Sequence, residues 1–459
     1  ERAPARLDVA ALTQGAKDSD SWWSLVASGH SVGVPGVVAM LAVAHAAHGR
    51  LPWPTLAAPA IALAEHGVAS GQRLPMLITQ LGHPALARPG PTQAFFFPEG
   101  QPLAAGQSLR NPLLAASLRQ IAAAGAEGFY RGPLAAQMVA AVQAEGGSLS
   151  LADLAAYQPR QRPPLCLDWR EYRVCSMGPP SGGGLALLQL LAMWQALPPL
   201  PQPLLSVAGA HRFSQLNRLV FADRDAHVAD PDFHPVPVKQ LLSPVYLKRQ
   251  LARVATMDGG PLASGLLVAG SGRAPELPST THLSIVDRDG NVASMTSSIE
   301  MGFGSGLMAG GFLLNNQLTD FALSGELTTA ANRPAPGKRP RSSMAPTVVF
   351  DRQGGVRLVI GSPGGSRIIP YVAWAIIAYL EQGMSLQQAL DLGHVVNLNQ
   401  QHTELEQGTA AEALAVGLSA LGHQVVIRAH DSGLHAIAIE QGRLVAAADG
   451  RREGLALAR

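Results

Sequence analysis

Polar and apolar side chains alternate along residues 280–286. The polar residues on one side of the extended chain are Thr280, His282 and Ser284. A period of two with β-branched residues predicts a strand. The turn residues Arg-Asp-Gly-Asn at 288–291 separate this run from a second one at 292–299, and an Asp-Gly pair in that position indicates a β-hairpin.

Elsewhere the apolar residues recur at helical spacing or in short β-branched runs. This pattern predicts helices at 37–48, 55–66, 108–124, 184–197, 208–229, 368–380, 386–392 and 410–421. It predicts strands at 347–350, 356–360, 424–427, 436–439 and 444–447, and a hairpin at 165–176. Residues 71–107 are rich in proline and glycine, which predicts a loop. Hairpins combined with layered helices favour an α+β sandwich.

The predicted helix 208–229 carries a group of charged residues that resembles a metal site only in composition. Asp223, Arg224 and Asp225 lie between His211 and His227. Because no metal-ligand spacing is present, we expect solvated ion pairs on a helix face.

The two cysteines, Cys166 and Cys175, exclude a disulfide framework and a cysteine-based zinc site. They flank Arg170-Glu171 symmetrically, so they oppose each other if those residues form the tip of a hairpin. A cross-strand disulfide is one outcome, and two buried free thiols are the favoured one.

The amino-acid composition limits the number of domains and the classes of partner. The chain has 459 residues, of which 47% are hydrophobic and 14% are charged. This is enough for a large core in one or two domains. The net charge of +2 provides no field for nucleic acid or a membrane surface. The longest apolar stretch, 184–197, is shorter than the roughly 18 residues that a membrane span needs, and no signal peptide is visible.

Thr280 is the candidate nucleophile because it stands at the head of the predicted strand with polar groups downstream. A threonine hydroxyl needs a base, and its own α-amino group serves if the chain is cut between Ser279 and Thr280. Residues 257–278 show no periodicity, as expected of an exposed linker before such a cut. The alternative is a hairpin with one wet face and no catalysis.

Three motifs in order favour catalysis. They are the 280–287 strand, the segment Lys338-Arg339-Pro340-Arg341-Ser342-Ser343-Met344, and the segment Gly361-Ser362-Pro363-Gly364-Gly365-Ser366-Arg367. Together they closely resemble the γ-glutamyltransferase family, and the resemblance covers nearly the whole chain. It implies the four-layer αββα sandwich of N-terminal nucleophile hydrolases. Residues 1–279 and 280–459 would be parts of the large and small subunits of one domain. Glu1-Arg2-Ala3-Pro4 resembles a segment some way into the family's large subunit, after its carboxylate-binding arginine.

The resemblance also implies roles for individual residues. Ser298 matches a residue that orients the nucleophile, and Gly364 with Gly365 matches the glycine pair of the oxyanion hole. Ser342 and Ser343 match the pair that binds the substrate's α-carboxylate. Asp320 matches the aspartate that binds the α-ammonium group, and Gln317 lies nearby.

Two departures from the family pattern leave the acyl group open. Glu300 stands where glutathione-cleaving members have asparagine, and the segment between Phe321 and Lys338 is short and has no tyrosine. The first hypothesis is therefore a γ-glutamyl hydrolase or transferase of glutathione metabolism, made as a self-cleaving bacterial zymogen. The second is an amidase of the same superfamily, such as a cephalosporin acylase or a poly-γ-glutamate depolymerase. The third is an unprocessed, non-catalytic paralogue.

The expected partners are a small γ-glutamyl substrate, water or an amine acceptor, and the two subunits themselves. We expect no metal, cofactor, nucleic acid or membrane to take part. The resemblance implies a periplasmic or secreted protein, with the cytoplasm as the alternative.

Overall fold

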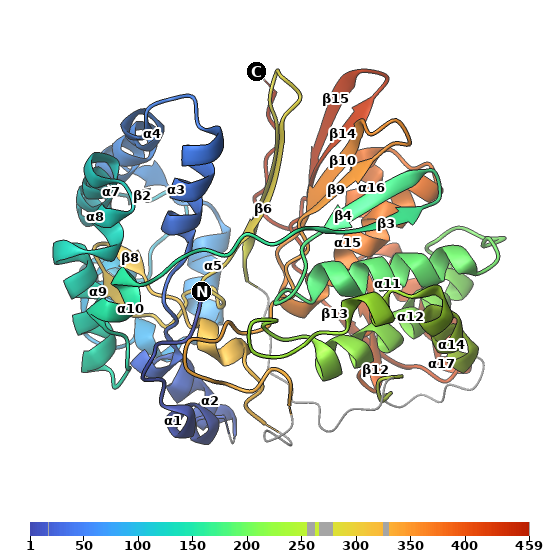
Figure 1. Cartoon of the computed structure of the whole chain (residues 1–459), viewed down its shortest axis with the longest axis horizontal. Coiled ribbons are helices and arrows are strands. Elements are labelled where there is room, and N and C mark those ends of the chain that lie inside the picture. Colours follow the sequence, from blue (N-terminus) through green and yellow to red (C-terminus); the bar gives the residue numbers. More distant parts are fainter. Residues whose placement is uncertain (17, 255–261, 266–278, 325–329, 459) are drawn as a thin grey trace.

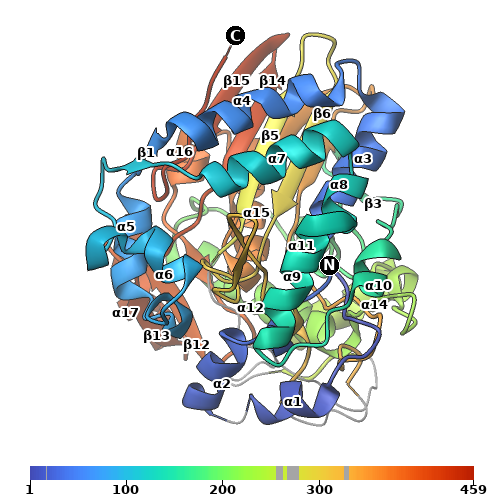
Figure 2. The same cartoon turned by 90° about the vertical axis from the view of Figure 1, so that its left-hand side faces the viewer.

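The protein is arranged in four layers, two of helices and two of strands. The computed structural model describes residues 1–459 except 17, 255–261, 266–278, 325–329 and 459. Figure 1 shows helices at the left, then the hairpin that contains β6, then a twisted sheet, then a second set of helices at the right. Figure 2 shows α4 and α7 crossing in front of the hairpin. This arrangement confirms the predicted α+β class and the αββα sandwich.

The helices lie in two groups on either side of the strands. Those in the first layer and near it are α1 (Val9–Gln14), α2 (Ser19–Val26), α3 (Val37–His48), α4 (Trp53–His66), α5 (Arg73–Gln80), α6 (Pro91–Phe96), α7 (Pro112–Ala124), α8 (Glu127–Tyr130), α9 (Gly132–Ala144) and α10 (Leu151–Ala155). The remaining helices are α11 (Gly183–Ala196), α12 (Val207–His227), α13 (Val238–Leu241), α14 (Pro244–Val254), α15 (Ile368–Ile376), α16 (Leu386–Asp391) and α17 (Ala415–Ala420).

Six antiparallel strands form the larger sheet, in the order β15-β14-β10-β9-β4-β3. They are β3 (Leu165–Trp169), β4 (Tyr172–Ser176), β9 (Thr347–Phe350), β10 (Val356–Gly361), β14 (His435–Glu440) and β15 (Arg443–Ala448). Smaller pairings join β1 (Val68–Ala69) to β2 (Ser108–Leu109) and β7 (Met308–Ala309) to β8 (Phe312–Leu313). A three-stranded sheet contains β11 (Val395–Val396), β12 (His402–Glu406) and β13 (Gln424–Arg428).

The predicted hairpin is formed by β5 (Thr281–Val286) and β6 (Val292–Ser297), and its polar face packs on the six-stranded sheet. The Ser284 hydroxyl donates to the carbonyls of Val359 and His435, and the Ser294 hydroxyl donates to the carbonyl of Ile360. Small polar side chains allow this close approach because they bond to the strand backbone beneath them. The hairpin thus fixes Thr280 near the end of β10.

Three sequence expectations are wrong. Residues 71–107 are not simply loop, because α5 and α6 form there; the apolar spacing within each is only two turns long. Cys166 and Cys175 are directly opposed in register on β3 and β4 and form a disulfide, so they are not free thiols. Asp223, Arg224 and Asp225 are buried rather than solvated, since both faces of α12 are covered in the core.

The main core lies between the six-stranded sheet and the helices α11, α12 and α15. Its largest side chains include Trp194, Phe213 and Trp374, and the Phe213 and Trp374 rings are 4.6 Å apart. α15 begins directly after the glycine turn that ends β10, so this apolar helix anchors the turn. None of the helices in the described part of the chain is long and apolar enough to cross a membrane. Among the described residues, no group of three or more His, Cys, Asp or Glu could hold a metal ion.

Candidate active site

Thr280 lies one residue before β5, where its backbone is strained. Its φ is +88°, a conformation that costs a β-branched residue free energy. The Thr280 hydroxyl donates to Ser298 Oγ at 3.2 Å. The Glu300 amide also donates to Ser298 Oγ, at 2.8 Å, so the position of this oxygen is fixed by two donors. Ser298 Oγ therefore lies within hydrogen-bond reach of the hydroxyl of the candidate nucleophile.

The peptide bond before Thr280 meets the glycine turn after β10. The Gly364 amide donates to the carbonyl oxygen of Ser279 at 3.0 Å. Gly364 has a φ of +133° and Gly365 a φ of +59°, which non-glycine residues rarely adopt. An N–H aimed at this carbonyl can stabilise the negative charge that develops on the oxygen during nucleophilic attack. Gly365 lines the cavity beside the same carbonyl.

Gly364→Ala is expected to slow cleavage of the Ser279–Thr280 bond by about 10²- to 10³-fold, the cost of losing one oxyanion donor. The added Cβ would lie 2.8 Å from the Tyr371 ring, so the turn must shift away from the Ser279 carbonyl. The measurement is the rate at which two fragments appear on a denaturing gel. Gly354→Ala is the matched control, because Gly354 has a φ of +84° and nothing within 4 Å of the new Cβ. Equal slowing in both variants would contradict the assignment.

A cavity opens beside Thr280, and the predicted substrate-binding residues line it. They are Glu300, Gln317, Asp320, Ser342 and Ser343, together with Arg341 and the nucleophile's neighbours Ser298 and Gly365. The structure thus brings every predicted site residue to one place. Carboxylates and serine hydroxyls lie on the wall of one cavity, which suits a ligand with both an ammonium and a carboxylate group.

The acidic part of the cavity comes from two segments. Gln317 Nε2 donates to Asp320 Oδ2 at 2.8 Å, within the short 3₁₀ turn Gln317–Asp320. Asn316 Nδ2 donates to Glu300 Oε2 at 2.5 Å. Glu300 is buried and has a φ of +75°, so its backbone is strained as well. Asn316, which sequence analysis did not assign, holds the Glu300 carboxylate in place.

Behind the serine pair lies a buried charged cluster that sequence analysis mistook for a solvated face. Arg224 Nη2 donates to Ser343 Oγ, and Arg224 Nη1 donates to Asp225 Oδ1 at 2.8 Å. Arg341 Nη2 lies 3.3 Å from the same Asp225 oxygen. The Arg224 guanidinium therefore contacts the serine pair from behind the cavity, a contact that only the fold reveals.

His282 is a structural residue rather than a base. Its Nδ1 lies 2.8 Å from Thr296 Oγ1 and its Nε2 lies 3.1 Å from Ser284 Oγ, so both nitrogens have hairpin partners. Burial, assisted by the nearby His435, lowers the pKa of His282 to about 3. A ring that resists protonation this strongly does not accept the threonine proton at neutral pH.

His282→Gln is expected to reduce the pH dependence of folding stability. The unfolded chain protonates this residue near pH ~6.5 and the folded chain only near pH 3, so the unfolded state binds more protons between these values. The free energy of unfolding therefore falls as the pH falls through that window, by up to about 1.4 kcal/mol per pH unit for one group. Denaturant unfolding at several pH values measures the slope. A variant with the wild-type slope would show that His282 is not buried as a neutral ring.

Arg452 is a further site residue that sequence analysis missed. Its Nη1 donates to the carbonyl oxygen of Thr280 at 3.0 Å, although the two residues are far apart in the chain. The only signal was the Arg451-Arg452 pair, which has no distinctive spacing.

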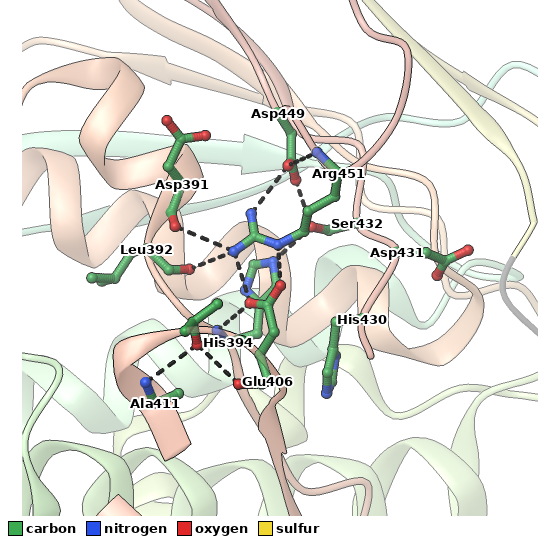
Figure 3. A network of polar contacts seen from close by, with 12 residues as sticks. Asp391, Leu392, His394, Glu406, Ala411, His430, Asp431, Ser432, Asp449 and Arg451 are labelled. Carbon is green, nitrogen blue, oxygen red and sulfur yellow. Dashed lines mark hydrogen bonds and ion pairs between the residues drawn. The ribbon is translucent and has the colours of Figure 1, made fainter. Parts of the chain in front are cut away.

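A second grouping of serine, histidine and aspartate has no catalytic geometry. Figure 3 shows Ser432 between His394 and Asp449. The carboxylate accepts the serine proton instead of orienting the histidine, and Ser432 is fully buried. No substrate can reach this hydroxyl, so the grouping is structural and joins the segments that flank β11, β14 and β15.

Comparison with known proteins agrees with this geometry. The family model for Gamma-glutamyltranspeptidase matches residues 1–458. A glutathione hydrolase proenzyme of Escherichia coli (strain K12) is 33% identical over 98% of this chain and 79% of the relative. An acylase ACY 1 proenzyme of Pseudomonas sp. (strain SE83) is 33% identical over 94% of this chain and 76% of the relative. The crystal structure of a cephalosporin acylase from Bacillus halodurans gives a TM-score of 0.84 at 26% identity, over 99% of this chain and 82% of that one.

The four-layer sandwich and its structural relatives define an N-terminal nucleophile hydrolase. Because the family model matches nearly the whole chain, the chain belongs to the gamma-glutamyltranspeptidase family. It is therefore a γ-glutamyltransferase or glutathione hydrolase-like enzyme, and the non-catalytic alternative is set aside.

Proposed function

We propose that this enzyme cleaves γ-glutamyl amides such as glutathione through an acyl-enzyme on Thr280, after cutting its own chain between Ser279 and Thr280. One observation carries the proposal. The Ser279 carbonyl accepts the Gly364 amide, while the Thr280 hydroxyl next to it is held by Ser298. The scissile carbonyl, an oxyanion donor and an oriented hydroxyl therefore meet at one peptide bond.

Self-cleavage begins when Thr280 Oγ1 attacks the Ser279 carbonyl carbon and Gly364 N–H stabilises the oxyanion. The C–N bond breaks, the hydroxyl proton passes to the departing nitrogen, and Ser279 becomes an ester on Thr280. Water then hydrolyses the ester, leaving a carboxylate on Ser279 and a free α-amine on Thr280. The strained φ of +88° supports this role, because cutting the bond releases the strain.

The mature enzyme would use the same groups on its substrate. The Thr280 α-amine, with an unperturbed pKa of ~7.7–8.0, accepts the hydroxyl proton as Oγ1 attacks the γ-carbonyl. The protonated amine of the substrate leaves, and an ester to Thr280 remains. Water or an amine acceptor then attacks this ester. Gly364 and Gly365 supply the oxyanion hole, Ser342 and Ser343 bind the α-carboxylate, and Asp320 with Glu300 binds the α-ammonium group.

A related acylase is the second candidate function. It is supported by the likeness to a cephalosporin acylase and to an acylase proenzyme, and by Glu300 in place of the family's asparagine. A glutaryl group lacks the amino group of a γ-glutamyl group. A γ-glutamyl hydrolase would use the carboxylates of Glu300 and Asp320 to select for that amino group, and an acylase would not.

The experiment compares wild-type kcat/KM on γ-glutamyl, glutaryl and poly-γ-glutamyl anilides after self-cleavage. The γ-glutamyl anilide is expected to react fastest. Faster reaction of the glutaryl compound would favour the acylase, and faster reaction of the polymer would favour a depolymerase.

We also propose that the enzyme works in the periplasm or outside the cell. The Cys166–Cys175 disulfide supports this, because such bonds persist in oxidising compartments and are rare in the cytosol. Cell fractionation of the native host with an antibody to the protein tests the proposal, and cytosolic recovery would contradict it.

A further inference from the structure

One short segment of the chain contacts the structures on both sides of the reacting peptide bond. It consists of residues 430–433, between the end of β13 and the start of β14, and we call it the support segment. His430 is 9% exposed and Ser432 is fully buried. Connecting segments usually run over the surface, where water satisfies their backbone polar groups. A connection buried beside the active site is unusual, and its contacts show what it holds.

His430 holds the tyrosine on which the oxyanion turn rests. Tyr371 is fully buried, and a Cβ added to Gly364 would come within 2.8 Å of its ring, so the ring lies directly against the Gly364 backbone. The Tyr371 hydroxyl lies 2.8 Å from His430 Nδ1. Burial lowers the pKa of His430 to about 4 and raises the pKa of Tyr371, so both side chains are neutral at neutral pH. With its proton on Nε2, which lies 3.6 Å from Glu404 Oε2, the histidine accepts a hydrogen bond from the tyrosine at Nδ1.

Asp431 holds the arginine that contacts the other side of the same peptide bond. Arg452 Nε donates to the Asp431 carbonyl at 2.7 Å, and Arg452 Nη2 lies 3.2 Å from Asp431 Oδ2. Arg452 Nη1 donates to the Thr280 carbonyl at 3.0 Å. Because two contacts to one residue fix the direction of the guanidinium, the position of the support segment also decides where Arg452 meets Thr280.

Gly433 fits between the oxyanion turn and this arginine. Its amide donates to Ser362 Oγ at 3.4 Å, at the end of β10. A Cβ added to Gly433 would lie 2.8 Å from Pro363 and 2.8 Å from Arg452. A larger residue at this position would therefore have to move the turn, the arginine or both.

Ser432 fixes the support segment at its centre. Its Oγ lies 2.6 Å from His394 Nε2, and its hydroxyl donates to the Asp449 carboxylate. Figure 3 shows these contacts, with His430 and Asp431 beside them. An anchored segment keeps its contacts to the turn and to the arginine at fixed positions relative to one another.

We propose that the support segment positions the two groups on whose distance the reaction depends, the oxyanion donor Gly364 and the peptide bond at Thr280. The histidine acts through Tyr371 and the aspartate acts through Arg452. The four residues of the segment act through other residues, so they are positioning residues. The inference rests on the proposed function, since that function assigns Gly364 and Thr280 to the reaction.

Gly433→Ala is expected to lower kcat for γ-glutamyl-para-nitroanilide about tenfold, a part of the ~10²- to 10³-fold cost of losing one oxyanion donor. The added methyl presses on Pro363 and Arg452 and displaces the turn. KM should stay near the wild-type value, because the acyl-group cavity is lined by other residues. Self-cleavage between Ser279 and Thr280 should slow by a similar factor, because it uses the same N–H.

Gly450→Ala is the matched control, since Gly450 is exposed and nothing lies within 4 Å of an added Cβ. Neither glycine has a positive φ, so the two substitutions differ in what the methyl contacts. The small fragment on a denaturing gel gives the amount of processed enzyme, and kcat is calculated per processed molecule. Slow processing is therefore not counted as slow turnover.

Two substitutions of His430 separate positioning from stability. His430→Leu leaves the Tyr371 hydroxyl without its acceptor, and kcat should fall about tenfold, as loss of one buried hydrogen bond allows. His430→Asn supplies an oxygen near the position of Nδ1, so kcat should recover most of this loss. Both variants lose the ring, and the melting temperature of each shows the cost to stability. If neither folds, Tyr371→Phe removes the same hydrogen bond, keeps the ring against Gly364 and should lower kcat at unchanged KM.

Wild-type kcat in folded Gly433→Ala, an equal loss in Gly450→Ala, or a change confined to KM would overturn the positioning role. So would a loss in His430→Leu that His430→Asn does not recover, or wild-type kcat in Tyr371→Phe. All of these outcomes leave γ-glutamyl hydrolysis by the wild type intact. Failure of the proposed function is a different result, in which processed wild-type enzyme does not hydrolyse the γ-glutamyl donor.

Discussion

Thr280→Ala should leave a single intact chain and abolish turnover. The alanine has no hydroxyl to attack the Ser279 carbonyl, so neither fragment 1–279 nor fragment 280–459 forms. Residual hydrolysis of a γ-glutamyl anilide should be lower by about ten-thousandfold or more, as expected when a nucleophile is removed. A denaturing gel and a rate assay on the same preparation measure both effects.

Thr281→Ala is the control for this experiment, because Thr281 is an exposed neighbour at the start of β5. It should process and turn over near the wild-type level. Ser298→Ala should process more slowly, since Thr280 Oγ1 loses the partner that orients it at 3.2 Å. If Thr280→Ala is still cut at the same bond, an outside protease makes the cut and the self-cleavage mechanism is wrong.

The parts of the site that the sequence predicted are those carried by continuous motifs. The Thr280 strand, the Ser342-Ser343 pair and the Gly364-Gly365 turn each keep their chemistry within a few residues. Local pattern is therefore enough to place them, and the resemblance implied that they meet. The structure does bring them to one cavity.

The residues that sequence analysis missed make contacts between positions that are far apart in the sequence. Arg452 reaches the Thr280 carbonyl from near the end of the chain, and Arg224 reaches Ser343 from α12. Neither contact leaves a periodic signal. Arg224 was assigned to a solvated face because charged residues are usually exposed. That assignment is wrong because α12 is buried on both faces. A buried guanidinium needs polar partners, and Arg224 has them in Asp225 and Ser343.

Predictions from local propensity were also wrong where tertiary packing determines the structure. α5 forms in a segment rich in proline and glycine, and its first turn is capped by Glu453 from the other end of the chain. The disulfide likewise depends on strand register, which opposes Cys166 to Cys175 directly. The sequence spacing of the two cysteines allowed this pairing but did not distinguish two free thiols from a disulfide bond.

Asp320→Asn should remove the preference for donors with a free α-ammonium group. In the wild type the carboxylates of Asp320 and Glu300 line one cavity. The ammonium group of a γ-glutamyl donor would gain an attractive contact with these carboxylates, and a glutaryl donor has no such group. Because a site that recognises a substrate N–H rejects an analogue that lacks it, γ-glutamyl-anilide should exceed glutaryl-anilide in kcat/KM by about 100-fold.

The asparagine keeps the shape of Asp320 and an oxygen that can accept from Gln317 Nε2. Only the charge is lost, so the preference should fall to a few-fold while the variant still processes into two fragments. Glu300→Gln should have a smaller effect, because its amide oxygen still accepts from Asn316 and Asp320 still carries a charge. Asp391→Asn, an exposed carboxylate at the end of α16, is the control for the loss of one negative charge.

The decisive comparison is between the two donors within each variant, since a folding defect lowers both rates alike and leaves their ratio unchanged. Loss of the ratio in Asp320→Asn alone assigns the ammonium contact to Asp320. Loss in both Asp320→Asn and Glu300→Gln assigns it to the pair. Equal hydrolysis of the two donors by the wild type would mean that the ammonium pocket does not operate, and the acylase would then be the better description of the enzyme.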